Sequence, residues 1–190
     1  MIPIGWNRPC YTGIHEDKFI EHLLSRYDRR DFITVSEFLA DSRSALSKVP
    51  SAPGIYFVTT MHPAEPDSFL EVGTGGYFKG ENPNVSISEL RQKWVDGASI
   101  LYIGRAGGTE PGGRKYKATL QKRLEQLLKF GSGKNIGHRG GKYLWQCEDS
   151  EDFQIHWYAT SKNENPVQLE RQLINAFSEN YGRLPFANLR

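Results

Sequence analysis

The protein has 190 residues, of which 38% are hydrophobic, 12% aromatic and 24% charged, with a formal net charge of +2 at pH 7. A chain of this size can bury a core as one soluble domain, and no apolar run reaches the length of a membrane-spanning helix. Residues 1–6 lack the basic and then apolar regions of a secretory signal, so we expect a cytoplasmic protein with no membrane partner, in which Cys10 and Cys147 stay reduced.

The N-terminal part of the chain has helical periodicity. Apolar residues recur at helical spacing over residues 16–48, and Pro50 and Pro53 end this pattern. We therefore expect residues 1–50 to form an N-terminal helical arm. The β-branched and aromatic run at 54–60 follows and predicts the first strand.

The middle of the chain alternates loops with regular elements. Residues 61–98 are rich in Pro, Gly and Asn, with a short helix expected near 88–95, and we interpret the whole stretch as an insertion. Residues 100–104 predict a second strand, and 119–130 predict an amphipathic helix.

The last part of the chain repeats this alternation. Residues 153–159 predict a third strand, and residues 166–181 predict a helix with Asn165 as N-cap, Pro166 in the first turn and Gly182 after its end. The sequence thus predicts an α/β (α+β) protein with a small mixed three-stranded sheet flanked by helices.

The charge is distributed unevenly. Residues 101–145 contain ten lysines and arginines against two glutamates, which gives this segment +8 and leaves −6 for the remainder. Such a segment favours a polyanionic partner, because each phosphate contact releases counterions. The alternative interpretation is a solvated lysine-rich surface.

The last predicted helix carries a carboxylate within its apolar face. At about 100° per residue, Leu173 and Phe177 lie on the apolar side, and Glu170 falls beside Phe177. A buried carboxylate must be paired, protonated or bound to a metal, since an isolated buried charge is costly. Glu170 is therefore either a catalytic or metal-binding group, or one half of an ion pair with an arginine.

The helix at 119–130 carries an arginine at the edge of its apolar face. This face is formed by Leu120, Leu124, Leu127 and Leu128. Arg123 lies about 40° from Leu127, so it either extends to solvent along the core or reaches a phosphate with paired donors.

Each of the first two predicted strands combines a tyrosine with a glycine. Tyr56 and Tyr102 are common types of core residue in a strand. Gly54 and Gly104 weaken a strand unless another group approaches the backbone closely. The glycines therefore hint at the floor of a site.

Two glycine-rich loops flank the arginine helix. Residues 104–113 lack the Gly-Lys-Ser/Thr ending of a nucleotide-binding loop, which disfavours an unrelated nucleotide- or phosphate-binding enzyme. His138 is a lone histidine in the basic loop 131–141, so we expect a surface or phosphate-contacting residue rather than a base. Asn188 offers a neutral donor and acceptor, and its simplest role is a hydrogen bond within the tail.

With these residues in this order, the chain resembles the GIY-YIG nuclease family. Gly54-Ile55-Tyr56 and Tyr102-Ile103-Gly104 look like its two name-giving strands. Arg123 is similar to the catalytic arginine of that family, Glu170 to its single metal-binding glutamate and Asn188 to its closing asparagine. The resemblance runs from Pro53 to Asn188, and the insertion at about 61–98 looks more like the restriction-endonuclease members.

This resemblance implies a nuclease domain at 51–190 that hydrolyses phosphodiester bonds in DNA, with restriction as one expected role. It implies that Glu170 binds Mg²⁺ or Mn²⁺, that Tyr56 or Tyr102 is the general base, and that Arg123 stabilises the pentacovalent charge. Many members carry His or Tyr four residues after the arginine, where this chain has Leu127, and His138 is the candidate to replace that side chain.

The expected partner is double-stranded DNA, bound by a monomer or a homodimer. The residues expected to contact it are Arg105, Lys134, His138, Arg139 and Lys142. The alternative is a nucleic-acid-binding module that keeps the scaffold without cleaving; the presence of both tyrosines, the arginine, the glutamate and the asparagine argues against it.

Overall fold

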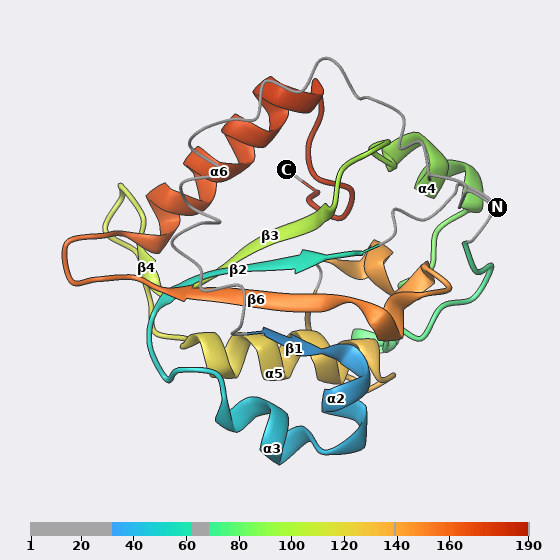
Figure 1. Ribbon diagram of the computed structural model, residues 1–190, viewed down its shortest axis with the longest axis horizontal. Helices are drawn as coiled ribbons and strands as arrows, with labels where there is room; N and C mark the ends of the chain where they lie inside the picture. Colours follow the sequence, from blue (N-terminus) through green and yellow to red (C-terminus); the bar gives the residue numbers. More distant parts are fainter. Residues whose placement is uncertain (1–31, 62–68, 139, 190) are drawn as a thin grey trace, which may run out of the picture.

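A computed structural model describes residues 32–61, 69–138 and 140–189 (Figure 1). The elements in chain order are β1 (Phe32–Thr34), α2 (Val35–Ala40), α3 (Ser42–Ser47), β2 (Gly54–Thr59), α4 (Ile87–Lys93), β3 (Ile100–Ala106), β4 (Gly108–Thr109), β5 (Lys115–Tyr116), α5 (Leu120–Gly131), β6 (Gln154–Ala159) and α6 (Pro166–Tyr181). Short 3₁₀ turns lie at Phe78–Gly80, Lys142–Gln146 and Ser150–Asp152. Residues 16–31 of the predicted arm, and Cys10, lie outside the described ranges.

The main sheet has the strand order β1-β6-β2-β3. The three predicted strands share this sheet, which confirms that expectation. β2 and β3 are neighbours, and their antiparallel register places Tyr56 opposite Gly104. β6 pairs with the other side of β2, where Tyr56 lies opposite Trp157.

Two features of the predicted sheet were wrong. The sheet has a fourth strand, β1, because Phe32–Thr34 pairs with Gln154–His156 of β6 instead of continuing a helix. All of the pairings between its described strands are antiparallel, so the sheet is not mixed. Only Val35–Ala40 and Ser42–Ser47 within the described part of the arm are helical, with Asp41 capping the second helix.

Helices cover both faces of the sheet. In Figure 1 the sheet crosses the middle of the molecule, with α6 on one side and α5, α2 and α3 on the other. Tyr56 and Tyr102 belong to the hydrophobic cluster that contains the leucines of α5. Ile55 and Ile103 belong to the cluster that contains Leu173 of α6. The alternation of side chains along β2 and β3 thus assigns the tyrosines to the α5 face.

Local sequence signals account for the ends of the two long helices. Thr119 accepts a hydrogen bond from Lys122 N at the start of α5. Asn165 accepts one from Val167 N at the start of α6, Pro166 occupies its first turn, and Gly182 ends it in the left-handed conformation. The predicted caps of α6 are confirmed.

A buried glutamine is one of several contacts that attach the insertion to the domain. The side chain of Gln146 accepts a hydrogen bond from Val85 N at 2.8 Å and donates to Leu70 O at 3.0 Å. Phe69 also forms an isolated antiparallel bridge with Cys147, whose buried thiol is free. The described part of the insertion therefore packs on the segment that precedes β6. Within the described ranges, no helix has the length and apolar character needed to span a membrane.

Candidate active site

A cavity of about 400 Å³ opens where β3, α5 and α6 approach one another. Residues from these elements and from the segment that joins β3 to α5 line it: Tyr102, Arg105, Gly107, Tyr116, Ala118, Arg123, Gln126 and Glu170. The sequence predicted four of these side chains as site residues: Tyr102, Arg105, Arg123 and Glu170. The fold thus gathers two phenols, two guanidinium groups and a carboxylate around one space.

The two tyrosines lie side by side, and Tyr102 lines this cavity. Their ring centroids are 5.9 Å apart. A Cβ atom on Gly104 would lie 2.3 Å from Cζ of Tyr56, so the phenol of Tyr56 fills the space that a side chain at position 104 would take. This confirms that a group approaches the backbone of that glycine. Burial raises the pKa of Tyr56, and it raises that of Tyr102 well above the ordinary value.

His138 contacts Tyr56 and is not a surface residue. Its Nε2 lies 3.2 Å from the Tyr56 hydroxyl, and its Nδ1 contacts Gly140 O. Only 2% of the residue is exposed, so the expected surface position is wrong. Burial, with Arg123 as a second cause, lowers the pKa of His138 to about 3. In a neutral ring with its proton on Nδ1, Nδ1 donates to the Gly140 carbonyl. Nε2 then accepts a hydrogen bond from the Tyr56 hydroxyl.

We expect His138 to make the stability of the fold sensitive to acid. Its pKa is depressed from 6.5 to about 3 on folding. The stabilisation from the neutral ring is therefore complete above pH 6.5 and is lost as the pH falls toward 3, by roughly 3 to 5 kcal/mol in all. Urea denaturation at a series of pH values measures this loss.

The matched variants for this experiment are His138→Gln and His156→Gln. His138→Gln should flatten the dependence of unfolding free energy on pH between 6.5 and 3. His156→Gln, a change at a half-buried histidine of β6, shows how much of the slope a second histidine accounts for. Equal slopes for wild type and His138→Gln would contradict the assignment.

Arg123 reaches the cavity from α5. It is half-buried, and its NH1 donates to Gln126 Oε1 at 2.9 Å on the next turn. Burial raises the pKa values of Tyr56, Tyr102 and Glu170. The positive charge of Arg123 opposes this effect on each of them. Arg123 forms no ion pair with any residue in the described ranges. The arginine at the edge of the leucine face thus faces the cavity, as the phosphate-directed interpretation requires.

Glu170 is paired with Arg105. Oε2 of the carboxylate accepts a hydrogen bond from Nε of Arg105 at 2.6 Å. The ion pair that the sequence left open as an alternative is therefore present. Oε1 accepts no hydrogen bond from the described part of the chain, and the carboxylate lines the cavity. Glu170 can consequently keep its arginine partner and still present one oxygen to a ligand.

Arg105 and Glu110 form an ion network around this carboxylate. Arg105 NH2 lies 3.3 Å from Glu110 Oε1, and Arg171 NH2 lies 2.5 Å from Glu110 Oε2. The guanidinium of Arg105 also lies over the Tyr116 ring, 4.3 Å from its centroid. Sequence reasoning missed Glu110. The alternation along β3 could have placed Arg105 on the α6 face, opposite to Tyr102.

Burial and charge act in opposite directions on the ion pair. Burial raises the pKa of Glu170, against the lowering effects of Arg105, Arg123 and Arg171. Burial alone would lower the pKa of Arg105, but Glu170 and Tyr116 outweigh it and the net pKa is raised. The carboxylate therefore carries a desolvation cost that its arginine partners do not fully offset.

Asn188 is buried at the free edge of β3. Its Oδ1 accepts from Ile103 N at 2.9 Å, and its Nδ2 donates to Ile103 O at 2.9 Å. Ala187 N also donates to Leu101 O at 2.8 Å. Asn188 thus binds the backbone next to Tyr102 and does not line the cavity, which gives it a positioning role in this arrangement.

The predicted DNA contacts lie in different surroundings. Lys134 is exposed and Lys142 is half-buried, and neither has an acidic partner in the described ranges. Lys122 and Lys129, in contrast, are both paired with Glu125 on the outer face of α5. Arg139 lies outside those ranges.

Comparisons with protein-family models, curated proteins and solved structures found no significant match to this chain. The functional interpretation therefore depends on the geometry of the cavity and on the motifs in the sequence.

Proposed function

We propose that this protein is a metal-dependent endonuclease that hydrolyses phosphodiester bonds in DNA. The observation that carries the proposal is the single cavity in which Tyr102, Arg123 and Glu170 meet, although they come from three different elements. Phosphodiester hydrolysis needs a proton acceptor, a cation for the developing charge and an anchor for a divalent ion. The motifs that resemble the GIY-YIG family support the same reaction.

Each protein group has a role that follows from its position. Tyr102 lines the cavity, so we assign to this residue the phenol that meets the attacking water. Tyr56 packs against it and donates a hydrogen bond to neutral His138, which fixes the orientation of the Tyr56 hydroxyl. The guanidinium of Arg123 offers paired donors to the phosphate oxygens as negative charge develops. Arg105 fixes the orientation of the Glu170 carboxylate.

The donor set around Glu170 fits one hard cation. No group of three or more His, Cys, Asp or Glu side chains that could hold a metal by themselves occurs in the described ranges. Mg²⁺, however, is commonly held by one or two carboxylates together with water and substrate phosphate. Glu170 Oε1 would supply that carboxylate oxygen. When bound, Mg²⁺ or Mn²⁺ supplies Lewis-acid polarisation of the scissile phosphate.

The decisive experiment is incubation of the protein with supercoiled plasmid DNA and Mg²⁺ or Mn²⁺, with and without a chelator. The proposal requires nicked or linear products that depend on the metal, and mapping of their ends gives the position of cleavage. A parallel incubation with structured RNA tests the choice of DNA. Intact plasmid with both metals would overturn the endonuclease proposal.

One observation favours the binding-only alternative. Arg105 already occupies one oxygen of Glu170, and such an ion pair can be purely structural. A module of that kind would bind DNA with a strong salt dependence and leave the plasmid intact. The plasmid experiment separates the two functions directly.

We expect the two phenols to contribute unequally to the cleavage rate. Tyr102→Phe removes the hydroxyl of the tyrosine that lines the cavity and should lower the single-turnover rate by about 10²- to 10⁴-fold, the usual contribution of a general base. Tyr56→Phe removes the hydroxyl of the neighbouring tyrosine and should have a smaller effect. Cleavage rates are measured beside thermal melts, which should remain near that of wild type. A larger loss for Tyr56→Phe would assign the base to Tyr56 instead.

A further inference from the structure

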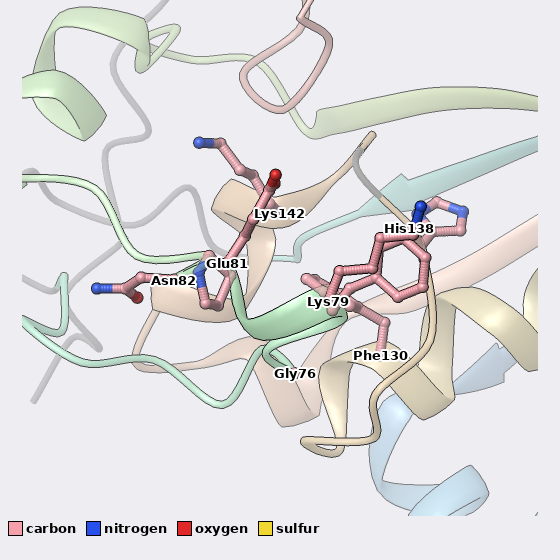
Figure 2. Close-up of a pocket in the computed structure, with 10 residues that line it drawn as sticks. Gly76, Lys79, Glu81, Asn82, Phe130, His138 and Lys142 are labelled. Atoms are coloured by element: carbon pink, nitrogen blue, oxygen red, sulfur yellow. The ribbon is translucent and has the colours of Figure 1, made fainter.

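A second cavity, of about 370 Å³, lies beside His138 and shares no lining residue with the first. Its walls come from residues 76–83 of the insertion and from Phe130 near the end of α5 (Figure 2). Gly137 and His138 of the following loop and Lys142, at the start of a 3₁₀ turn, complete them. Through His138 this cavity is one side chain away from the Tyr56 hydroxyl.

The lining combines flat apolar surfaces with cations. Phe78, Pro83 and Phe130 supply the apolar part. The charged part consists of two cations, Lys79 and Lys142, and one carboxylate, Glu81, which leaves a net positive charge. Asn82 adds an amide. A volume of this size falls within the range of small-molecule sites, which are mostly apolar with a few polar groups that fix orientation.

The backbone around the cavity is built to hold Phe78 in place. A Cβ atom on Gly137 would lie 2.9 Å from the Phe78 ring, so this ring rests on the bare backbone of the basic loop. Lys79 adopts the left-handed conformation with φ of 55°, which is uncommon for a residue other than glycine. Its N–H donates to Asn135 Oδ1 at 3.2 Å. Backbone strain of this kind is concentrated at ligand sites.

We propose that this cavity binds one unstacked nucleotide of the DNA substrate. The base would lie against Phe78 and Phe130, and its phosphate would lie near Lys79 and Lys142. The inference rests on the proposed function, because it places a nucleotide of the substrate next to the tyrosine–histidine pair. Proteins that take a base out of the stack hold it between aromatic or apolar side chains and read its edge with polar groups.

The first test is binding of the four deoxynucleoside 5′-monophosphates, measured by calorimetric titration. These probes contain no phosphodiester, so the result is independent of cleavage. We expect binding that is at least tenfold tighter than that of inorganic phosphate. Phe78→Ala should weaken it about tenfold, as expected for loss of one base–aromatic contact, and Lys142→Ala should weaken it several-fold. Phe78 is 38% exposed, so the variant should fold; a thermal melt checks this.

The matched controls are Tyr77→Ala and Lys93→Ala. Tyr77 is an exposed aromatic residue next to Phe78, and Lys93 is an exposed lysine in the last turn of α4; neither lines the cavity. Both variants should bind nucleotides as wild type does. Equal binding of phosphate and nucleotide, or equal effects of the control and cavity variants, would overturn the inference.

The second test distinguishes a nucleotide of the substrate from a free nucleotide. A duplex that carries 2-aminopurine at successive positions near the cleavage site, held in Ca²⁺, should gain fluorescence at one position with wild type and not with Phe78→Ala. Nucleotide binding without any fluorescence gain would overturn the assignment to the substrate strand. Nucleotide binding and a fluorescence gain without plasmid cleavage would overturn the endonuclease proposal and leave the nucleotide site standing.

Discussion

Replacing Glu170 by glutamine is expected to abolish Mg²⁺-dependent DNA cleavage and leave the protein folded. The amide has the size of the carboxylate, but it lacks the charge that a hard cation needs from its ligand. Loss of a Lewis acid worth several kcal/mol corresponds to a rate decrease on the order of a thousandfold or more. The single-turnover rate with saturating Mg²⁺, beside the rate in chelator, measures this effect.

The same variant should melt at the wild-type temperature or slightly above it. Burial raises the pKa of Glu170, so the folded state disfavours the charged carboxylate even beside Arg105. Glutamine removes that cost at neutral pH, and Arg105 keeps its contacts with Glu110 and with Gly107 O. The expected gain in stability is small, because the variant also loses the charge-assisted hydrogen bond between Arg105 and the carboxylate.

The control is Glu110→Gln. Glu110 also pairs with Arg105, but it does not line the cavity. This variant should retain most of the metal-dependent cleavage. Should Glu170→Gln unfold the protein while its folded fraction cleaves at the wild-type rate, Glu170 is a structural ion-pair partner and the mechanism proposed above is wrong.

Arg123→Ala is expected to lower the cleavage rate by about 10²- to 10³-fold, the usual effect of removing one donor to a developing oxyanion. A second consequence follows from its charge. Arg123 is among the causes that lower the pKa of Tyr56 and of Tyr102, so its removal raises both phenol pKa values further. The alkaline rise of the pH–rate profile should therefore move to higher pH.

Lys122→Ala is the matched control for Arg123→Ala. Lys122 lies on the same helix, its side chain is 61% exposed, and it pairs with Glu125 on the outer face. Its removal should leave the rate and the pH profile unchanged at moderate salt. Arg123→Lys should recover only part of the activity, because an ammonium group lacks paired planar donors. A wild-type pH profile for Arg123→Ala would mean that its charge does not act on the phenols.

The strands β2, β3 and β6 and the two long helices could be predicted because their signals are local. The leucine stripe of α5 fixes the direction of Arg123, and Asn165, Pro166 and Gly182 mark the ends of α6. The Tyr56 and Tyr102 strands share the predicted sheet, although 45 residues lie between the two tyrosines. Strand-type composition predicts that both belong to a sheet, but it does not say which strands are neighbours.

The features that the sequence did not reveal depend on distant partners. β1 is only three residues long and lies inside a helical pattern; its partner, Gln154–His156, is more than 100 residues away. His138 lies in a basic glycine-rich loop, and nothing local shows that the loop folds over Tyr56. Glu110 lies five residues after Arg105, but it meets Arg171, 61 residues away, only through tertiary structure. Local patterns carry none of this information.

The strand order has a consequence for how the protein forms. β2 lies at the centre of the sheet, yet Gly54 pairs with Ala159, and β1 pairs with the same late strand. Contacts between such distant segments close slowly, because a long loop must be ordered before any pairing compensates for the lost entropy. During synthesis the sheet can be completed only after β6 has left the ribosome, and Glu170 follows eleven residues after Ala159. Folding of this protein is therefore expected to be slow for its size, with the cavity among the last parts to assemble.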